Sequence, residues 1–219
     1  MKTYMDRPIG LLLKVGISVA ALGAIILLAA LAGGCDHQHS HTYIAYDRTG
    51  PGLQVSRGDR PLALSGRSLS VGDKAPDAVV RTTRWRDVRI SDYRGEVVIL
   101  SVVPELGTRV CDLTTRTLDE KAPRLPDDVA ILTVSTDTSA HQQDWASANE
   151  IDYVVLLSDA ARRDFGEAYG LTIEGSDDLM RAMIVIDREG VIRHIEVPAE
   201  IGQEPGIGRA VEVARKLAG

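Results

Sequence analysis

The sequence predicts an α/β domain in which helices cover both faces of a mixed β-sheet, and three observations lead to this expectation. Two apolar runs, 97–103 and 129–135, have the length and composition of buried strands. Each run is followed by a segment with helical spacing. A later pair of apolar runs, 182–186 and 191–195, flanks the turn 187–190 and predicts a hairpin. Strands that alternate with helices, followed by a late hairpin, are typical of a layered α/β domain.

The remaining elements follow from turn and capping signals. Short alternating runs on both sides of 57–61, which contains Gly-Asp, predict a β-hairpin at the start of the domain. Ser139 is expected to cap the second helix and Gly170 to end the third. Further strands are expected at 77–83, 88–90 and 153–157, a capped single turn at 91–95, and helices at 112–121, 139–149, 160–169 and 206–217.

Residues 1–34 have the pattern of an export signal or a membrane anchor. Three basic residues precede the uncharged stretch 15–34, which as a helix rising about 1.5 Å per residue would span the bilayer core of about 30 Å. Small residues directly before Cys35 resemble a bacterial lipoprotein signal, with Cys35 as the lipid-modified residue, although Ala32 stands where such signals usually have Leu. An uncleaved membrane anchor and an ordinary cleaved signal are the alternatives. All three place the domain outside the cytoplasm, and the first two attach it to a membrane.

Residues 35–52 are expected to form a flexible, histidine-containing linker before a folded domain at 53–219. The alternating residues His37, His39 and His41 are weak candidates for metal binding. A solvated spacer is the favoured alternative, because a flexible tail does not fix ligand geometry. We therefore predict neither a metal nor a cofactor.

Composition excludes two classes of protein. The net charge is −6, and Lys and Arg form no basic stripe, so we expect no nucleic-acid partner. Two cysteines in 219 residues provide no disulfide framework.

Cys111 is the residue best placed for chemistry. It follows the 97–103 strand and a loop that begins at Pro104, and it falls on the first turn of the next helix. Unpaired backbone N–H groups and the positive end of the helix dipole favour a thiolate at that position. The sequence therefore predicts a nucleophilic cysteine.

The pattern Pro104-x3-Thr108-x2-Cys111 resembles the peroxiredoxin active-site motif on a thioredoxin-like fold. The early hairpin, the 71–76 loop and the segment 181–187 resemble the thiol peroxidase branch, and the similarity covers 53–219. The resemblance implies a thiol peroxidase that needs no cofactor, often as a homodimer.

The resemblance also implies roles for four residues. Cys111 would attack the O–O bond of a hydroperoxide and become a sulfenic acid. Thr108 would position the peroxide, Arg181 would stabilise the thiolate and the developing charge, and Pro104 would exclude water. The chemistry agrees, because peroxide reduction needs a thiolate, an orienting hydroxyl and a fixed cation.

Three of these roles have a simpler alternative. Cys111 would be an inert buried thiol, Thr108 only a helix cap, and Arg181 a surface charge at a strand edge. Asp112 follows the cysteine directly, and its carboxylate would oppose a thiolate if it faced the sulfur.

The chain departs from the thiol peroxidase pattern in two places. Ala146 occupies the position where such proteins usually carry a second, resolving cysteine, and Cys35 is no natural substitute on its tail. We therefore expect a one-cysteine mechanism with an external thiol or a thioredoxin-like protein as the reductant. Val103 stands where the family tends to have an aromatic residue.

Three other functions compete with a peroxidase. A thioredoxin-like disulfide reductase is disfavoured, because Cys111 is not part of a Cys-x-x-Cys pair. A peroxide sensor would use the same sulfenic acid as a signal without turnover. A degenerate domain that serves as a scaffold would account for Ala146 and Asp112.

Overall fold

The computed structural model of the chain describes residues 43–219. The expected export segment, Cys35 and the three linker histidines lie outside these residues. Among residues 43–219, no helix is both long enough and apolar enough to cross a membrane.

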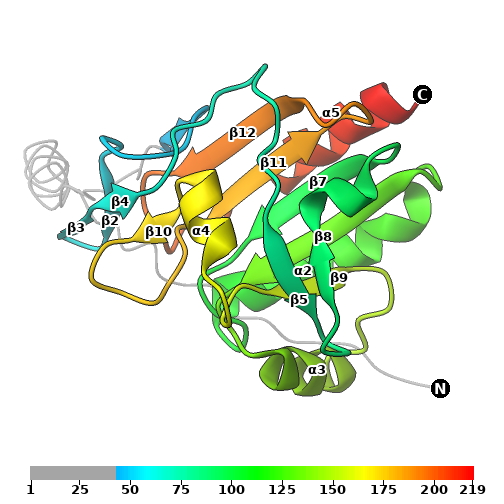
Figure 1. Cartoon of the computed structure of the whole chain (residues 1–219), viewed down its shortest axis with the longest axis horizontal. Coiled ribbons are helices and arrows are strands. Elements are labelled where there is room, and N and C mark those ends of the chain that lie inside the picture. Colours follow the sequence, from blue (N-terminus) through cyan, green and yellow to red (C-terminus); the bar gives the residue numbers. More distant parts are fainter. Residues whose placement is uncertain (1–42) are drawn as a thin grey trace, which may run out of the picture. The chain divides into compact units, whose positions relative to one another are not determined.

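A mixed eight-stranded sheet forms the centre of the domain (Figure 1). The strand order is β1-β12-β11-β7-β8-β9-β5-β6, in which β7, β8 and β9 run parallel and every other neighbouring pair is antiparallel. The strands span Ala45–Tyr46 (β1), Val79–Thr82 (β5), Asp87–Arg89 (β6), Val97–Val102 (β7), Val129–Ser135 (β8), Val155–Ser158 (β9), Ala182–Ile186 (β11) and Ile192–Pro198 (β12).

Two small sheets and the helices complete the domain. The small sheets pair Val55–Arg57 (β2) with Arg60–Leu62 (β3), and Leu64–Ser65 (β4) with Thr172–Ile173 (β10). The helices are Arg109–Lys121 (α2), Ser139–Ala148 (α3), Asp164–Tyr169 (α4) and Ile207–Ala218 (α5), with short 3₁₀ turns at Ile90–Tyr93 (η1) and Ala122–Arg124 (η2).

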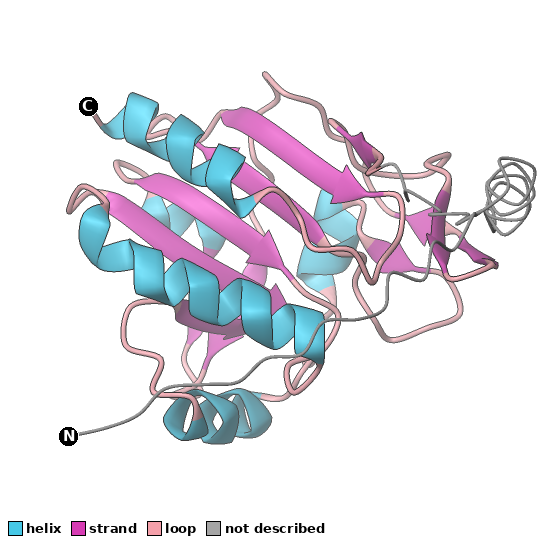
Figure 2. Ribbon diagram, turned by 180° about the vertical axis from the view of Figure 1, so that it is seen from behind, coloured by secondary structure: helices cyan, strands magenta, loops and turns pink. Residues whose placement is uncertain are grey.

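The sheet separates two hydrophobic cores because alternate residues of its strands face opposite sides. One core includes Phe165 and Tyr169 of α4, whose rings stack with centroids 4.3 Å apart. The other includes Cys111 and Leu118 of α2 with Trp145 of α3. Figure 2 shows α2 and α5 lying across one face of the sheet, where they cover this second core. Every residue of β7 is buried, so the loop that follows this strand rests on a rigid base.

The observed elements confirm the predicted α/β class, the early hairpin and the late hairpin, with three differences. Thr138, not Ser139, caps α3: its hydroxyl accepts the His141 N–H at 3.2 Å. Helix α4 begins only at Asp164, because Arg163 takes a left-handed conformation with φ 61°.

The third difference concerns the start of the domain. The expected linker 35–52 includes residues that belong to the fold, since β1 pairs with the end of β12. Thr49 is buried, and Gly50 donates its N–H to the carbonyl of Gly170. The folded domain therefore begins before residue 53.

Candidate active site

The strand β7 and the helix α2 place Cys111 at one end of the sheet. Cys111 is the third residue of α2 and is 1% exposed. The loop between the two elements is tied to the neighbouring strand–helix connection, since Leu106 donates its N–H to Asp137 Oδ2 at 2.8 Å. Asp137 is itself buried. The position of the thiol is therefore set by two parallel strands and not by a free loop.

Arg181 supplies a fixed cation beside the thiol. It directly precedes β11, which runs antiparallel to β7 with Ala182 opposite Val102, so the sheet register brings Arg181 to the end of β7. Its Nη2 donates to Cys111 Sγ at 3.2 Å, and its Nε donates to the Ile201 carbonyl at 2.9 Å. Arg181 is 3% exposed. The alternative of a surface strand-edge charge is wrong.

The third nitrogen of the guanidinium is without a partner among the described residues. Arg181 Nη1 is buried and has no hydrogen-bond acceptor among the described residues. An unsatisfied buried donor costs about 1–3 kcal/mol, more when it is charged. A buried charged donor without an acceptor is expected at a place where an oxygen atom of a ligand binds.

Thr108 stands at the N-cap of α2 but does not cap it. Its hydroxyl makes no cap bond and donates instead to the Glu105 carbonyl at 3.0 Å. With the hydroxyl proton committed to Glu105, the Thr108 oxygen remains as an acceptor for an O–H group. The alternative of a simple capping role does not describe this side chain.

Asp112 does not bond to the sulfur. Its Oδ1 accepts the Gly107 N–H at 2.7 Å, so the carboxylate ties the first turn of α2 to the preceding loop. Gly107 has φ 88°, a conformation that glycine adopts without strain. The carboxylate therefore has a structural partner next to the helix N-terminus, where negative charge is favourable.

Cys111, Arg181 and Thr108 line one pocket that opens to solvent and holds about 520 Å³ of empty space. All four predicted residues belong to it. The lining residues are Arg57, Pro104, Glu105, Thr108, Cys111, Asp178, Arg181 and Ile201.

Sequence reasoning missed four lining residues. Arg57 falls in the predicted Gly-Asp hairpin, but nothing local indicates where that hairpin docks. Asp178 lies in a polar loop without a motif. Glu105 is one of the unspecified positions of the motif. Ile201 contributes to the site through its backbone carbonyl, which no side-chain pattern reveals.

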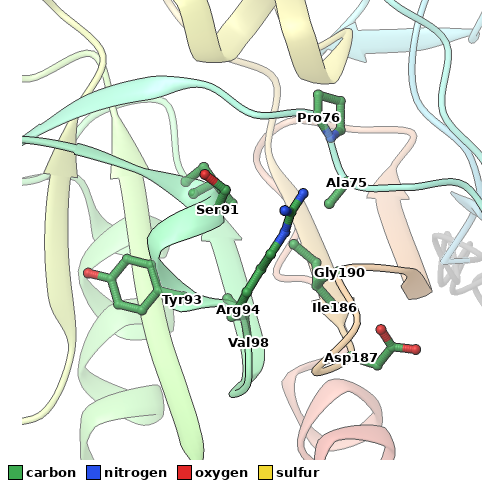
Figure 3. Close-up of a pocket in the computed structure, with 10 residues that line it drawn as sticks. Ala75, Pro76, Ser91, Tyr93, Arg94, Val98, Ile186, Asp187 and Gly190 are labelled. Atoms are coloured by element: carbon green, nitrogen blue, oxygen red, sulfur yellow. The ribbon is translucent and has the colours of Figure 1, made fainter.

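A second pocket lies toward the other end of β7, where Val98 forms part of its wall. It holds about 310 Å³ between η1 and the turn after β11. Figure 3 shows the Arg94 side chain extending between Ser91 and Ala75. None of its lining residues is a cysteine, so it offers no thiol for redox chemistry.

No metal site accompanies the pocket of Cys111. Within the described part of the chain, no three His, Cys, Asp or Glu side chains are grouped to hold a metal ion. The histidines at 37, 39 and 41 lie outside that part.

Known proteins resemble this chain over most of the folded domain. The AhpC/TSA family profile matches residues 71–195. A thiol peroxidase from Bacillus subtilis is 38% identical over 157 residues, which cover 72% of this chain and 93% of that protein. A thiol peroxidase from Oceanobacillus iheyensis is 40% identical over 145 residues, covering 66% of this chain and 88% of that protein.

Solved structures give the same fold. The crystal structure of a peroxiredoxin-like protein from Aquifex aeolicus superimposes with a TM-score of 0.71 at 30% identity, covering 77% of this chain and 99% of that one. The domain thus has the thioredoxin-like fold in its peroxiredoxin form, with a mixed central sheet flanked by helices. The chain belongs to the AhpC/TSA family, and its curated relatives are of the thiol peroxidase type.

Proposed function

We propose that this chain is a thiol-dependent peroxidase that reduces hydrogen peroxide or an organic hydroperoxide through Cys111. The thiolate attacks one oxygen of the substrate, the O–O bond breaks, and the other oxygen leaves as hydroxide or alkoxide and takes up a proton. Cys111 becomes a sulfenic acid, the first and reversible step of cysteine oxidation. Thr108 would accept the O–H of the hydroperoxide and orient it, and Pro104 would exclude water.

The observation that carries this proposal is the geometry of Arg181. One nitrogen contacts the sulfur at 3.2 Å, while a second is buried without an acceptor among the described residues. The guanidinium can therefore stabilise the thiolate before reaction and receive negative charge on the leaving oxygen during it. Donors that are fixed before the charge develops lower a barrier most effectively.

The proposal includes a one-cysteine cycle. Cys111 is the one free cysteine among the described residues. Ala146 stands in α3 where a resolving thiol is expected, and it packs against the core that contains Cys111. An external thiol or a thioredoxin-like protein would then reduce the sulfenic acid.

The proposal also places the enzyme outside the cytoplasm, attached to a membrane through residues 1–34 or a lipidated Cys35. The support is the charge and apolar pattern of the sequence. Intact mass of the protein purified from whole cells separates the three alternatives for the N-terminus: added diacylglycerol on Cys35, an unprocessed chain, or a shorter unmodified chain. A homodimer, expected from the family resemblance, is checked by analytical ultracentrifugation.

The decisive experiment compares the wild type with Cys111→Ser. We expect the wild type to consume peroxide with many turnovers when dithiothreitol is supplied, and the variant to consume none above background. A sensor would form the sulfenic acid once without turnover, and a scaffold would not form it. Unchanged peroxide consumption by Cys111→Ser would exclude the catalytic role of this residue.

The one-cysteine cycle has its own test in a Cys35→Ala variant. We expect both sulfenic acid formation and turnover with a thioredoxin-like reductant to survive this change. A variant that still forms the sulfenic acid but loses turnover would show that Cys35 is the resolving thiol.

A further inference from the structure

We propose that Arg57 and Asp178 form the docking site for the reductant, and that the reductant is a small zwitterionic thiol. Such a molecule carries a carboxylate and an ammonium group near its sulfur, as the free amino acid cysteine does. This inference rests on the proposed peroxidase function and assigns the second substrate of the same pocket.

The pocket has more room than peroxide reduction requires. One water needs about 10–15 Å³ of the space open to the centre of a water-sized sphere, so the two oxygen atoms of a peroxide need about twice that. The pocket offers about 220 Å³ of such space. The peroxide groups Cys111, Thr108 and Arg181 line only part of the wall.

The remaining wall carries an ion pair with no role in peroxide chemistry. Arg57 Nη2 lies 2.7 Å from Asp178 Oδ2, and the two side chains are 52% and 29% exposed. An ion pair this exposed adds little to the stability of the fold. The pair lines the pocket that contains Cys111, and it can open to a charged ligand at little cost to the stability of the fold.

The hairpin that carries Arg57 is fixed relative to the catalytic arginine. The Ile201 N–H donates to the Ser56 carbonyl at 2.9 Å, and Glu200 accepts the Ser56 hydroxyl and the Gly58 N–H, each at 2.9 Å. The carbonyl of the same Ile201 accepts Arg181 Nε. One segment thus sets the spacing between the two guanidinium groups, and a ligand held by Arg57 is held at a defined place relative to the sulfur.

The charges of the pocket match a zwitterion better than an ion of one sign. Two guanidinium groups, of Arg57 and Arg181, face two carboxylates, of Glu105 and Asp178. Arg binds a carboxylate through two parallel hydrogen bonds, and a carboxylate accepts from an ammonium group. The ligand would insert its carboxylate toward Arg57 and its ammonium toward Asp178, opening the ion pair between them.

The chemistry of this docking is balanced. The thiol sulfur attacks Cys111 Sγ of the sulfenic acid, an S–S bond forms, the S–O bond breaks, and the hydroxyl leaves as water with the proton of the thiol. A second thiolate attacks the sulfur of the first thiol in the mixed disulfide. Cys111 returns as a thiolate, and two thiols have supplied the two electrons.

The test measures steady-state turnover of the full chain with four thiols: cysteine, cysteamine, 3-mercaptopropionate and dithiothreitol. Arg57→Gln should raise KM for the two thiols that carry a carboxylate about tenfold, the effect of losing one charged hydrogen bond. Asp178→Asn should raise KM for the two thiols that carry an ammonium group by a similar factor. Arg60→Gln is the matched control, because Arg60 lies opposite Arg57 in the β2–β3 hairpin but does not line the pocket.

Single-turnover oxidation of Cys111 by hydrogen peroxide, followed without any thiol, separates this inference from the peroxidase itself. We expect the change in KM for Arg57→Gln to exceed any change in the oxidation rate. Equal losses with dithiothreitol and cysteine, or turnover with reduced thioredoxin but with none of the charged thiols, would overturn the docking site while leaving the peroxidase standing. A wild type whose Cys111 is not oxidised would overturn the peroxidase.

Discussion

Two neighbouring strand–helix units of this domain have the same local architecture and opposite uses. In each unit a buried parallel strand leads into a helix whose N-cap is a threonine: Thr108 after β7 and Thr138 after β8. The third residue of each helix is the one whose N–H a cap normally receives. The Thr138 hydroxyl accepts the His141 N–H in this way. The Thr108 hydroxyl instead donates to the Glu105 carbonyl and accepts no N–H of its helix.

The difference shows how a reactive site is obtained from a stable motif. A side-chain cap stabilises a helix by about 0.5–2 kcal/mol. The β7–α2 unit lacks this cap at Cys111, the residue that would react with peroxide. The β8–α3 unit is capped and also supports its neighbour, since Asp137 accepts the Leu106 N–H of the catalytic loop. The surrounding fold thus holds in place a helix start that is open for the thiolate and its substrate.

The largest effect is expected from replacing the guanidinium group that distinguishes the two helix starts. Arg181→Lys should lower kcat/KM for hydrogen peroxide about 10²–10³-fold, as when one preorganised donor of a charged transition state is lost. A lysine cannot bond the sulfur, the Ile201 carbonyl and a substrate oxygen in the planar arrangement of a guanidinium.

Arg193→Lys on β12 is the matched control, because Arg193 is half exposed and pairs with Asp187 away from the pocket. We expect it to keep wild-type kinetics. Unfolding curves of both variants check that the fold is intact, and a loss below about threefold in Arg181→Lys would contradict the role assigned by its geometry.

The second prediction exchanges the same residue at the two caps. Thr108→Val should lower kcat/KM about 10–100-fold, the value of one oriented hydrogen bond, with little change in the free energy of unfolding. Thr138→Val should do the reverse, lowering that free energy by about 1 kcal/mol and leaving turnover near the wild type.

Denaturant unfolding and peroxide kinetics on the same samples give both quantities. Thr108→Ser, which keeps the hydroxyl, should restore most of the activity lost in Thr108→Val. If Thr108→Val lost stability and Thr138→Val lost activity, the comparison between the two units would be wrong.

The sequence was sufficient for the scaffold and for part of the site. Apolar runs predicted β7, β8 and the late hairpin because burial dictates composition directly, and short alternating runs around a Gly-Asp turn predicted the early hairpin. The sequence could not show whether Thr138 or Ser139 caps α3, since both residue types cap helices and only the backbone conformation decides which residue does so. Short strands such as β1 and β10 contain too few residues to show a periodicity.

The composition of the pocket depended on sheet register and docking. Cys111 and Arg181 are 70 positions apart, and only the family resemblance paired them before the antiparallel contact of β11 with β7 was known. Arg57 reaches the pocket because its hairpin docks on the segment that follows β12. No local pattern encodes that contact, so the Arg57–Asp178 pair went unrecognised.

The smallest effect is expected outside both units, at Glu196 on β12. His194, 3.7 Å away, together with hydrogen bonds from Tyr43 and the Gly206 N–H, lowers the pKa of Glu196 to about 2 from 4.5. A carboxyl group whose pKa is lower in the folded state stabilises the fold above its unfolded pKa, and this contribution is lost as the pH falls from about 4.5 to about 2.

Because Glu196 is partly open to solvent, we expect Glu196→Gln to lower the free energy of unfolding by only about 1 kcal/mol near pH 5. The two proteins should converge below pH 2, where both side chains are uncharged. Exposed Glu204→Gln serves as the control. A difference that persists below pH 2 would show that hydrogen-bond geometry and not charge is responsible, and peroxide kinetics at neutral pH should be unchanged, because Glu196 does not line the pocket of Cys111.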